Sequence, residues 1–352
     1  MLYPLKLKPV YKEPIWGGTW LRDKFGKEIP SDSTGESWEI ACHPNGISMI
    51  DNGHLKGKSL QEVIWQYQEE ILGSRIGKEG AEKFPLLVKI LDASDKLSVQ
   101  VHPEDDYAKK YENGELGKTE MWYVIDAKPD AKLVYGVKAG TTPQQFEQAI
   151  KDGVLEHYLN FVEVKAGDVF FIPATMLHAI GEGILIAEIQ QNSDTTYRVY
   201  DWNRTDDEGN PRELHVQKAL DVTNLSDVTG REKAEGVTIN EGGNKRTFLV
   251  ACKYFATERI EVQRILQEIS HKEKFDMLIF LEGEGKIIAK TGAENFKAGD
   301  SFLIPACMGD YSIVGECKLL KSYVPDIKKD VIQPLKNKEI VDARMLKKIG
   351  GL

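Results

Sequence analysis

An internal repeat constrains the fold of this 352-residue chain more than any other feature of its sequence. Residues 166–183 read AGDVFFIPATMLHAIGEG, and residues 298–315 read AGDSFLIPACMGDYSIVG. The Ala-Gly-Asp, Ile-Pro-Ala and Met positions coincide at an offset of 132 residues. This duplication predicts two copies of one structural module within a single chain.

A second pair of similar segments lies upstream of the repeat. EMWYVID at 120–126 resembles DMLIFLE at 276–282, but here the offset is 156 residues. The difference indicates an insertion in the first copy near 137–160. We expect this insertion to hold a helix at Pro143–Ile150, because Thr142 is a suitable N-cap and proline suits the first helical turn.

Short apolar segments broken by Gly, Pro, Asn and Asp dominate the rest of the chain, which is typical of β-strands. Strands are predicted at Leu86–Leu91, Leu97–Val101, Met121–Ile125, Lys132–Tyr135 and Val169–Ile172. Further helices are predicted at Leu60–Leu72, with Ser59 as its N-cap, and at Arg212–Asp221. We therefore expect a mainly β fold of two modules with small helical insertions.

The repeated segment resembles the second half of a cupin jelly-roll barrel. Gly167 and Asp168 form a turn into a strand that Pro173 ends, because proline cannot donate to the ladder. In cupins a metal-ligand histidine follows this proline. His178 takes that place in the first copy and Asp310 in the second, so we expect the second module to keep the fold and lack the metal site.

The predicted domain organisation follows from the repeat. A catalytic, metal-binding cupin-like module is expected at residues 1–235, with helical insertions near 60–80 and 140–156. A second, degenerate cupin-like barrel is expected at 236–325, followed by a C-terminal tail at 326–352.

Charge and cysteine usage limit the classes of function. The net charge of −9 disfavours nucleic acid and anionic membranes as partners, since both attract basic surfaces. The four cysteines have no CxxC spacing or disulfide framework, and the sequence contains no apolar run long enough for a signal peptide or a membrane span. These features favour a cytoplasmic protein that acts on a small molecule.

The segment Leu97–Pro103, LSVQVHP, carries a polar stripe. Ser98, Gln100 and His102 share one face of the predicted strand, opposite an apolar face. Glu120 opens the next apolar strand, and His178 follows the repeated proline. Two imidazoles, a carboxylate and an amide suit zinc, iron or manganese, with a position left for water or substrate.

These motifs resemble type I mannose-6-phosphate isomerases of the short bacterial form. The resemblance rests on LSVQVHP, GKTEMWYV, IPATMLHAIGEG and TTYRVYDWNR, and it extends from IWGG and GESWE through the second barrel. It implies a zinc-dependent isomerase that interconverts mannose 6-phosphate and fructose 6-phosphate by metal-assisted proton transfer through an enediolate. The partner is then a sugar phosphate, and the chain could act as a monomer or as a homodimer.

The resemblance also implies roles for individual residues. One zinc ion per chain is expected, with the ligands Gln100, His102, Glu120 and His178. Arg198 is the expected catalytic arginine, although an ion pair with Asp194 or Asp201 is the structural alternative. The proton carrier stays open among Lys118, Glu36, His43 and a metal-bound water.

The phosphate requires cations in an acidic protein. The expected substrate-binding residues are Ser98, Lys89, Glu36 and Arg204. Lys89 is a lone charge in an apolar strand, so it should face a cavity, unless it lies at a strand edge. Trp16 and Trp38 could pack under the sugar or fill the core.

Two other functions fit the same motifs. Two histidines and a carboxylate could bind iron in an oxygenase, although an oxygenase does not need the phosphate-binding set. A sugar-binding cupin without catalytic activity is the second alternative. Oxygen consumption would identify the former, and binding without turnover the latter.

Overall fold

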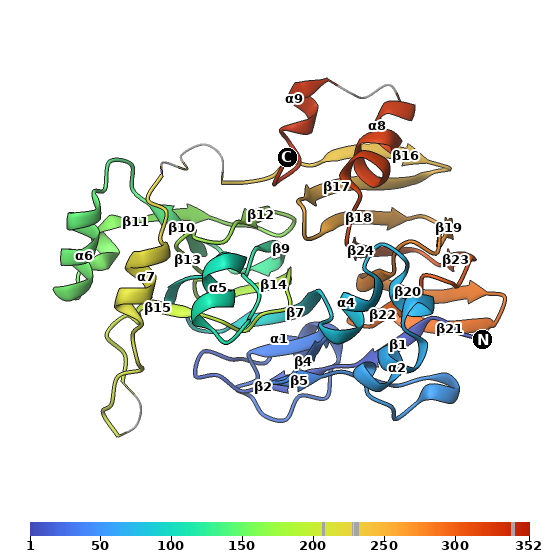
Figure 1. Cartoon of the computed structure of the whole chain (residues 1–352), viewed down its shortest axis with the longest axis horizontal. Coiled ribbons are helices and arrows are strands. Elements are labelled where there is room, and N and C mark those ends of the chain that lie inside the picture. The colour runs from blue at the N-terminus through green and yellow to red at the C-terminus, as the bar shows by residue number, and fades with distance from the viewer. Residues whose placement is uncertain (206–207, 227, 229–231, 339–341) are drawn as a thin grey trace.

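The computed structural model describes residues 1–205, 208–226, 228, 232–338 and 342–352. The prediction of a mainly β chain is confirmed. Figure 1 shows two β-rich modules side by side, with the helix α6 at the outer end of the first. Among the described residues, no helix is long and apolar enough to cross a bilayer.

The first module is built from two larger sheets. One has the strand order β12-β9-β14-β7-β3-β2 and the other β11-β10-β13-β8-β15, with a small β4–β5 pair beside them. The bounds are β2 Val10–Lys12, β3 Glu36–Ile40, β4 Cys42–His43, β5 Gly46–Ile47, β7 Leu86–Ala93, β8 Val99–Val101, β9 Glu120–Ala127, β10 Lys132–Val137, β11 Leu159–Glu163, β12 Val169–Ile172, β13 His178–Ala179, β14 Ile184–Gln191 and β15 Tyr197–Tyr200.

The second module repeats the first sheet strand for strand, in the order β22-β20-β24-β18-β17-β16. The register agrees as well: Glu120 pairs with Ile172 in the first module, and Asp276 pairs with Ile304 in the second. The duplication seen in the sequence is therefore a duplication of the fold. The bounds are β16 Val237–Glu241, β17 Asn244–Ala251, β18 Ala256–Val262, β19 Ile265–Ile269, β20 Asp276–Ala289, β21 Gly292–Lys297, β22 Ser301–Ile304, β23 Asp310–Val314 and β24 Cys317–Tyr323.

The N-terminal strand belongs to the sheet of the second module. β1 (Leu5–Lys8) pairs with β22 on one side and with β6 (Met49–Ile50) on the other. The first residues of the chain therefore extend the second module before the chain enters the first.

The predicted insertion is present in the first module. Between β10 and β11 the chain forms α6 (Pro143–Lys151) and the 3₁₀ helix η2 (Leu155–Tyr158), whereas only residues 290–291 separate β20 from β21. The Thr142 hydroxyl accepts a hydrogen bond from the Gln145 amide, and the Gln145 side-chain oxygen accepts one from the Thr142 amide. This capping box is why α6 begins where the sequence predicted.

Two helix predictions require correction. The segment Leu60–Leu72 is two helices, α2 (Leu60–Tyr67) and α3 (Glu69–Leu72), because Gln68 adopts φ +42° and breaks the run. The helix predicted at Arg212–Asp221 begins later, as α7 (Val216–Val222). The remaining helices are α1 Trp20–Phe25, η1 Gly53–Leu55, α4 Gly77–Glu82, α5 Asp105–Tyr111, η3 Ile327–Ile332, α8 Gln333–Asn337 and α9 Ala343–Leu346.

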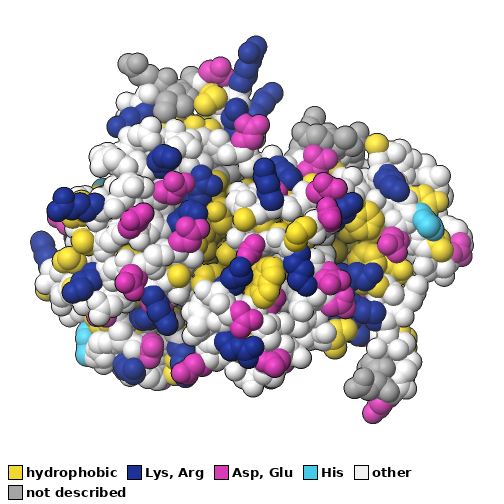
Figure 2. Space-filling model, turned by 180° about the vertical axis from the view of Figure 1, so that it is seen from behind, with side chains coloured by type: hydrophobic (Ala, Val, Ile, Leu, Met, Phe, Trp, Pro, Cys, Tyr) yellow, Lys and Arg dark blue, Asp and Glu magenta, His cyan; other side chains and the backbone are white. Residues whose placement is uncertain are grey.

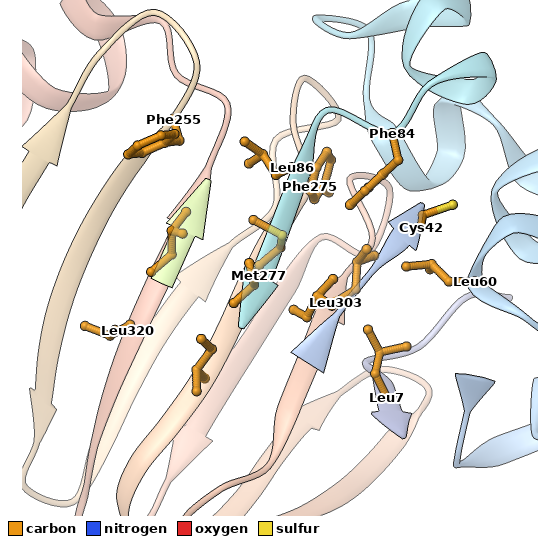
Figure 3. Close-up of a cluster of buried hydrophobic side chains, with 14 of the residues drawn as sticks. Leu7, Cys42, Leu60, Phe84, Leu86, Phe255, Phe275, Met277, Leu303 and Leu320 are labelled. Carbon is orange, nitrogen blue, oxygen red and sulfur yellow. The ribbon is translucent and has the colours of Figure 1, made fainter. Parts of the chain in front are cut away.

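The two modules pack sheet against sheet. Leu86 of β7 and Met121 of β9 belong to one buried apolar cluster with Met277 of β20 and Leu320 of β24. Figure 3 shows Leu86 beside Phe275 and Met277 in this cluster. Because strands alternate their side chains, the opposite face of each sheet is free to form the interior of its own module.

The C-terminal tail covers the second module. Val331, Leu335 and Ile349 are buried in a cluster with Phe248 of β17 and Val237 of β16. Although the tail is unlike the two modules in sequence, it is part of the folded core. On the face drawn in Figure 2, acidic and basic side chains are interspersed.

Candidate metal centre

Three side chains converge between the two sheets of the first module. The ligand atoms of His102, Glu120 and His178 lie within 4.8 Å of one another, and all three residues are buried. The Nε2 atom of His102 lies 3.2 Å from one Glu120 carboxylate oxygen, and that of His178 lies 3.8 Å from the other. The predicted ligands therefore meet at one point.

Backbone carbonyls orient both imidazoles. The Nδ1 atom of His102 lies 2.9 Å from the Thr195 carbonyl oxygen, and Nδ1 of His178 lies 2.9 Å from that of Met176. Each Nδ1 must carry a proton to make this bond, so each Nε2 is left with a lone pair. Metal-binding histidines are commonly held this way, by a hydrogen bond at the other ring nitrogen.

The environment favours the protonation states that bind cations. Burial lowers the pKa of His102 to about 3, assisted by the charge of Lys118, and burial also lowers the pKa of His178. Burial opposes ionisation of Glu120, but the Lys118 ammonium and the His102 ring bring the pKa of this carboxyl well below its usual value. At neutral pH the cluster thus offers two neutral imidazoles and a carboxylate.

The cluster is incomplete without a cation. Among the described residues, His102 Nε2 and Glu120 Oε1 are buried and make no hydrogen bond, although the Lys118 ammonium lies 3.0 Å from that oxygen as an ion-pair partner. Orphaned buried polar atoms are costly, and here they point at one another. A divalent cation with nitrogen and oxygen preference would satisfy both, so the residues present fit a metal ion.

Gln100 lies at the edge of this cluster. It pairs with His178 across β8 and β13, and its amide nitrogen is 3.4 Å from Nε2 of that ring. Rotation of the amide by half a turn would direct its oxygen to the same place. Val99 and Val101, the alternate residues of β8, pack in the apolar cluster on the outer face, as the predicted alternation requires.

Lys118 lies two residues before Glu120, the first residue of β9. Its Nζ atom lies 3.0 Å from Glu120 Oε1, and the side chain is 5% exposed. The structure therefore brings this predicted residue to the cluster.

A row of polar side chains runs from the cluster across the facing sheet. The Trp122 indole donates to Glu120 at 3.2 Å and to Glu188 at 2.9 Å. Glu188 lies 3.7 Å from Lys89, which lies 3.5 Å from Glu36. Lys89 is therefore an interior residue of a central strand, and the strand-edge alternative is wrong.

Glu188 was not identified from the sequence. It stands alone among apolar residues in ILIAEIQQ, and a lone acid in such a strand is the signal that singled out Lys89. Burial and the nearby Glu120 raise the pKa of Glu188 to about 7.

Arg198 lies on the strand next to Gln100. The two residues pair across β15 and β8, and Arg198 Nε donates to the Ser98 hydroxyl oxygen at 3.2 Å. Asp194 and Asp201, its alternative ion-pair partners, instead accept hydrogen bonds from other side chains. Arg198 and Ser98 are thus brought together on the side of the site that faces Glu120.

Arg204 is placed differently from the other predicted substrate-binding residues. Its guanidinium donates to Asp95 at 2.8 Å, to Asp201 at 2.7 Å and to the Lys96 carbonyl at 2.7 Å. A phosphate contact would require Arg204 to leave these partners, so its geometry favours fixing the loop that follows β15.

His43 and the tryptophans lie around the site. His43 is buried, with Nε2 3.9 Å from Glu115, and burial lowers its pKa. Trp38 is buried in the core, which was one of the two expectations for this residue. Its indole also donates to Glu36 at 2.6 Å. Trp16 is buried in the apolar cluster of the first module.

Among the described residues of the second module, no such cluster of candidate metal ligands is found. The structure also corrects one detail of the sequence alignment. Asp310, expected opposite His178, is exposed, and the neighbouring Tyr311 is the residue buried inside. Tyr311 pairs with Glu268 as His178 pairs with Gln100. The shift arises because β23 holds one more residue after the shared Met than β13 does.

Fold and site together define a cupin-like protein with a candidate metal centre in one of its two modules. Residues 4–148 match the family model of the type I phosphomannose isomerase catalytic domain, and residues 244–324 match the mannose-6-phosphate isomerase cupin domain. This chain therefore belongs to the type I phosphomannose isomerases, the enzymes that interconvert mannose 6-phosphate and fructose 6-phosphate.

Individual relatives agree with this assignment. The chain is 44% identical to a probable mannose-6-phosphate isomerase GmuF of Bacillus subtilis, over 92% of this chain and 100% of that relative. It is 43% identical to mannose-6-phosphate isomerase ManA of the same organism, over 91% and 99% of the two chains. The crystal structure of a Bacillus subtilis mannose 6-phosphate isomerase superposes with a TM-score of 0.84 at 40% identity, covering 91% and 99% of the two chains.

Proposed function

We propose that this chain isomerises mannose 6-phosphate at the cluster of His102, Glu120 and His178, with one zinc ion held there. The observation that carries the proposal is the convergence of two Nε2 lone pairs on a buried carboxylate, with both imidazoles oriented by backbone carbonyls. Gln100 is the proposed fourth ligand through its amide oxygen.

Bound zinc would supply a positive charge that polarises the sugar oxygens at C1 and C2. The chain itself contributes the charges around those oxygens. Arg198 faces the cluster across β15 and β8, where a fixed guanidinium stabilises negative charge that develops during isomerisation. Isomerisation moves one proton between C1 and C2, and the charge it leaves is that of an enediolate.

Lys118 is our proposed proton carrier. Its amine lies 3.0 Å from Oε1 of Glu120, a proposed metal ligand. A general base must lie within hydrogen-bond reach of the proton that it removes, and Lys118 is a titratable side chain in direct contact with a proposed ligand. Glu36 lies farther along the polar row and His43 lies 3.9 Å from Glu115, and both are proposed to bind sugar hydroxyls.

The phosphate is proposed to bind at Ser98. The Ser98 oxygen accepts from Arg198, which leaves its hydroxyl proton to donate to a phosphate oxygen. Lys89 is already neutralised by two carboxylates, so its proposed role is to hold Glu36 and Glu188 in place. Arg204 is proposed to keep the loop after β15 in position.

The experiment is a coupled assay of fructose 6-phosphate formation from mannose 6-phosphate. The protein is assayed as purified, after chelation, and after zinc is added back, with metal content measured each time. Activity that is lost on chelation and restored by zinc supports the proposal. A zinc-loaded protein that gives no fructose 6-phosphate would overturn it.

A further inference from the structure

The second module reaches the active site through one hydrogen-bonded chain. The turn between β17 and β18 carries Tyr254, whose hydroxyl donates to Asp105 Oδ2 at 2.5 Å. Asp105 begins α5 in the first module, two residues after the His102-Pro103 pair. This contact therefore joins the degenerate module to the segment that follows a proposed metal ligand.

The other oxygen of Asp105 binds the segment that carries Lys118. Asp105 Oδ1 accepts from the Gly117 amide at 2.9 Å and from the Gln191 side chain at 2.9 Å. Gln191 accepts in turn from the Thr119 amide at 2.9 Å. The amides on both sides of Lys118 are thus held by this one network.

The packing leaves this segment little freedom. A Cβ atom on Gly117 would lie 2.6 Å from the Asp105 amide nitrogen, so the segment touches the start of α5 directly. The Lys118 amide donates to the Pro103 carbonyl at 3.1 Å. A change in where Asp105 points would therefore move the backbone that sets the direction of Lys118 and Glu120.

The negative charge of Asp105 strengthens the hydrogen bonds that hold the segment around Lys118. Burial opposes its ionisation, but the hydrogen bonds from Tyr254, Gly117 and Gln191 lower the pKa of Asp105 overall. An ionised carboxylate makes stronger hydrogen bonds than a neutral acceptor, so the network holds its geometry more firmly.

We propose that Tyr254 of the second module is a positioning residue for the active site, acting through Asp105 on the Gly117–Glu120 segment. The inference rests on the proposed function, in which this segment supplies the proton carrier and a metal ligand. It gives the degenerate module a catalytic purpose: its tyrosine fixes a loop of the module that carries the chemistry. Positioning errors of a fraction of an ångström suffice to slow an enzyme.

The test is the zinc-saturated full-length enzyme with Tyr254→Phe, which removes one hydroxyl and keeps the ring. We expect kcat to fall about tenfold with KM changed less than about twofold, as for other groups that orient a site. The matched control is Tyr323→Phe, which removes a tyrosine–carboxylate hydrogen bond to Glu258 within the second module. It should lower the melting temperature and leave kcat unchanged.

A double-mutant cycle separates positioning from general destabilisation. Asp105→Ala should lower kcat at least as much as Tyr254→Phe, and adding Tyr254→Phe to it should cause no further loss. Asp105→Asn, which keeps an acceptor for Gly117, should restore most of the activity. Wild-type kcat in Tyr254→Phe, or additive losses in the double variant, would overturn the inference.

Failure of the proposed function would be seen separately. Lys118→Met with wild-type kcat would remove Lys118 as the proton carrier. The effect of Tyr254→Phe on kcat would still decide whether the second module positions the site.

Discussion

Lys321 of the second module occupies the register position that Glu188 occupies in the first. Glu188 pairs with Trp122 and Lys89, and Lys321 pairs with Leu278 and Glu258, their counterparts in the repeat. The ammonium of Lys321 contacts Asp276 at 3.1 Å and also Glu268. These two acids stand where Glu120 and Gln100 stand in the first module, so a side-chain cation takes the place that the metal is proposed to take.

The first prediction follows from the position of the Lys321 ammonium, which lies where the first module is proposed to bind a metal ion. Lys321→Met removes the ammonium that Glu268 and Asp276 share, while Arg246 still contacts Glu268 and Lys274 still contacts Asp276. Loss of this charged hydrogen-bond donor should destabilise folding by about 1.5–3 kcal/mol. Chemical denaturation measures the loss. Lys318→Met, on the same strand but in an exposed pair with Glu282, should cost less than about 1 kcal/mol. Equal losses of stability in the two variants would contradict the idea that the Lys321 ammonium takes the place of a metal ion in the second module.

The second prediction concerns the metal and uses the repeat as its own control. Glu120→Gln removes the central carboxylate, so zinc content after dialysis should fall severalfold, and kcat should fall by about 100-fold or more. Asp276→Asn makes the same chemical change at the matching position of the second module. It should leave zinc content unchanged, at one ion per folded chain, and two ions per wild-type chain would contradict this reasoning.

The third prediction tests how the carboxylate is held. Trp122→Phe keeps an aromatic ring but removes the indole donor to Glu120 and Glu188. We expect zinc affinity, measured by competition with a chelator, to weaken by about tenfold. Trp38→Phe removes the equivalent donor to Glu36, which lies outside the metal cluster, and should leave zinc affinity unchanged.

The fourth prediction compares Arg198, the expected catalytic arginine, with Arg204, which was expected to bind substrate. Arg198→Ala should lower kcat/KM by about 100- to 1000-fold, because the cation proposed to stabilise the reacting oxygens is lost. Arg204→Ala should chiefly lower the melting temperature, because Arg204 binds Asp95 and Asp201 rather than the site. A larger loss of kcat/KM in Arg204→Ala than in Arg198→Ala would reverse these assignments.

The sequence was most informative where a local pattern determines structure. Turn residues and proline fix the ends of β12 and β22, and the capping residues Ser59 and Thr142 fix the starts of α2 and α6. The repeat then predicted the two modules and the site of the insertion. The convergence of His102, Glu120 and His178 could also be anticipated, since His102 and Glu120 flank predicted strands and His178 follows the repeated proline.

Features that depend on partners across the sheets were not predictable. Nothing near Lys89 in sequence shows that Glu36 and Glu188 flank it, because strand order decides that contact. Likewise, a single extra residue in β23 turns Tyr311 inward and Asp310 outward. Because side chains alternate along a strand, a shift of one residue exchanges the inward and outward positions, and an alignment without gaps does not reveal it.

The fifth prediction is a pH dependence of stability at Asp92. This residue of β7 accepts the Trp20 amide at 2.6 Å, and burial raises its pKa from 3.8 to about 6. The nearby Asp23 raises this pKa further, whereas Lys128 and the backbone donors lower it. The folded protein therefore holds the Asp92 proton more tightly than the unfolded chain does.

The sign of the effect follows from linkage. A group with a raised folded-state pKa contributes stability that is complete below its unfolded value of 3.8 and is lost as pH rises through about 6. Asp92→Asn stays neutral and keeps a carbonyl acceptor for the Trp20 amide, so it does not lose this contribution. Between pH 4.5 and about 7.5, the free energy of unfolding of the variant should rise by about 1–2 kcal/mol relative to that of the wild type, after allowance for solvent screening of the carboxylate. Urea denaturation of both proteins across this range measures the difference, and a difference that does not change with pH would show that Asp92 is ionised throughout in the folded state.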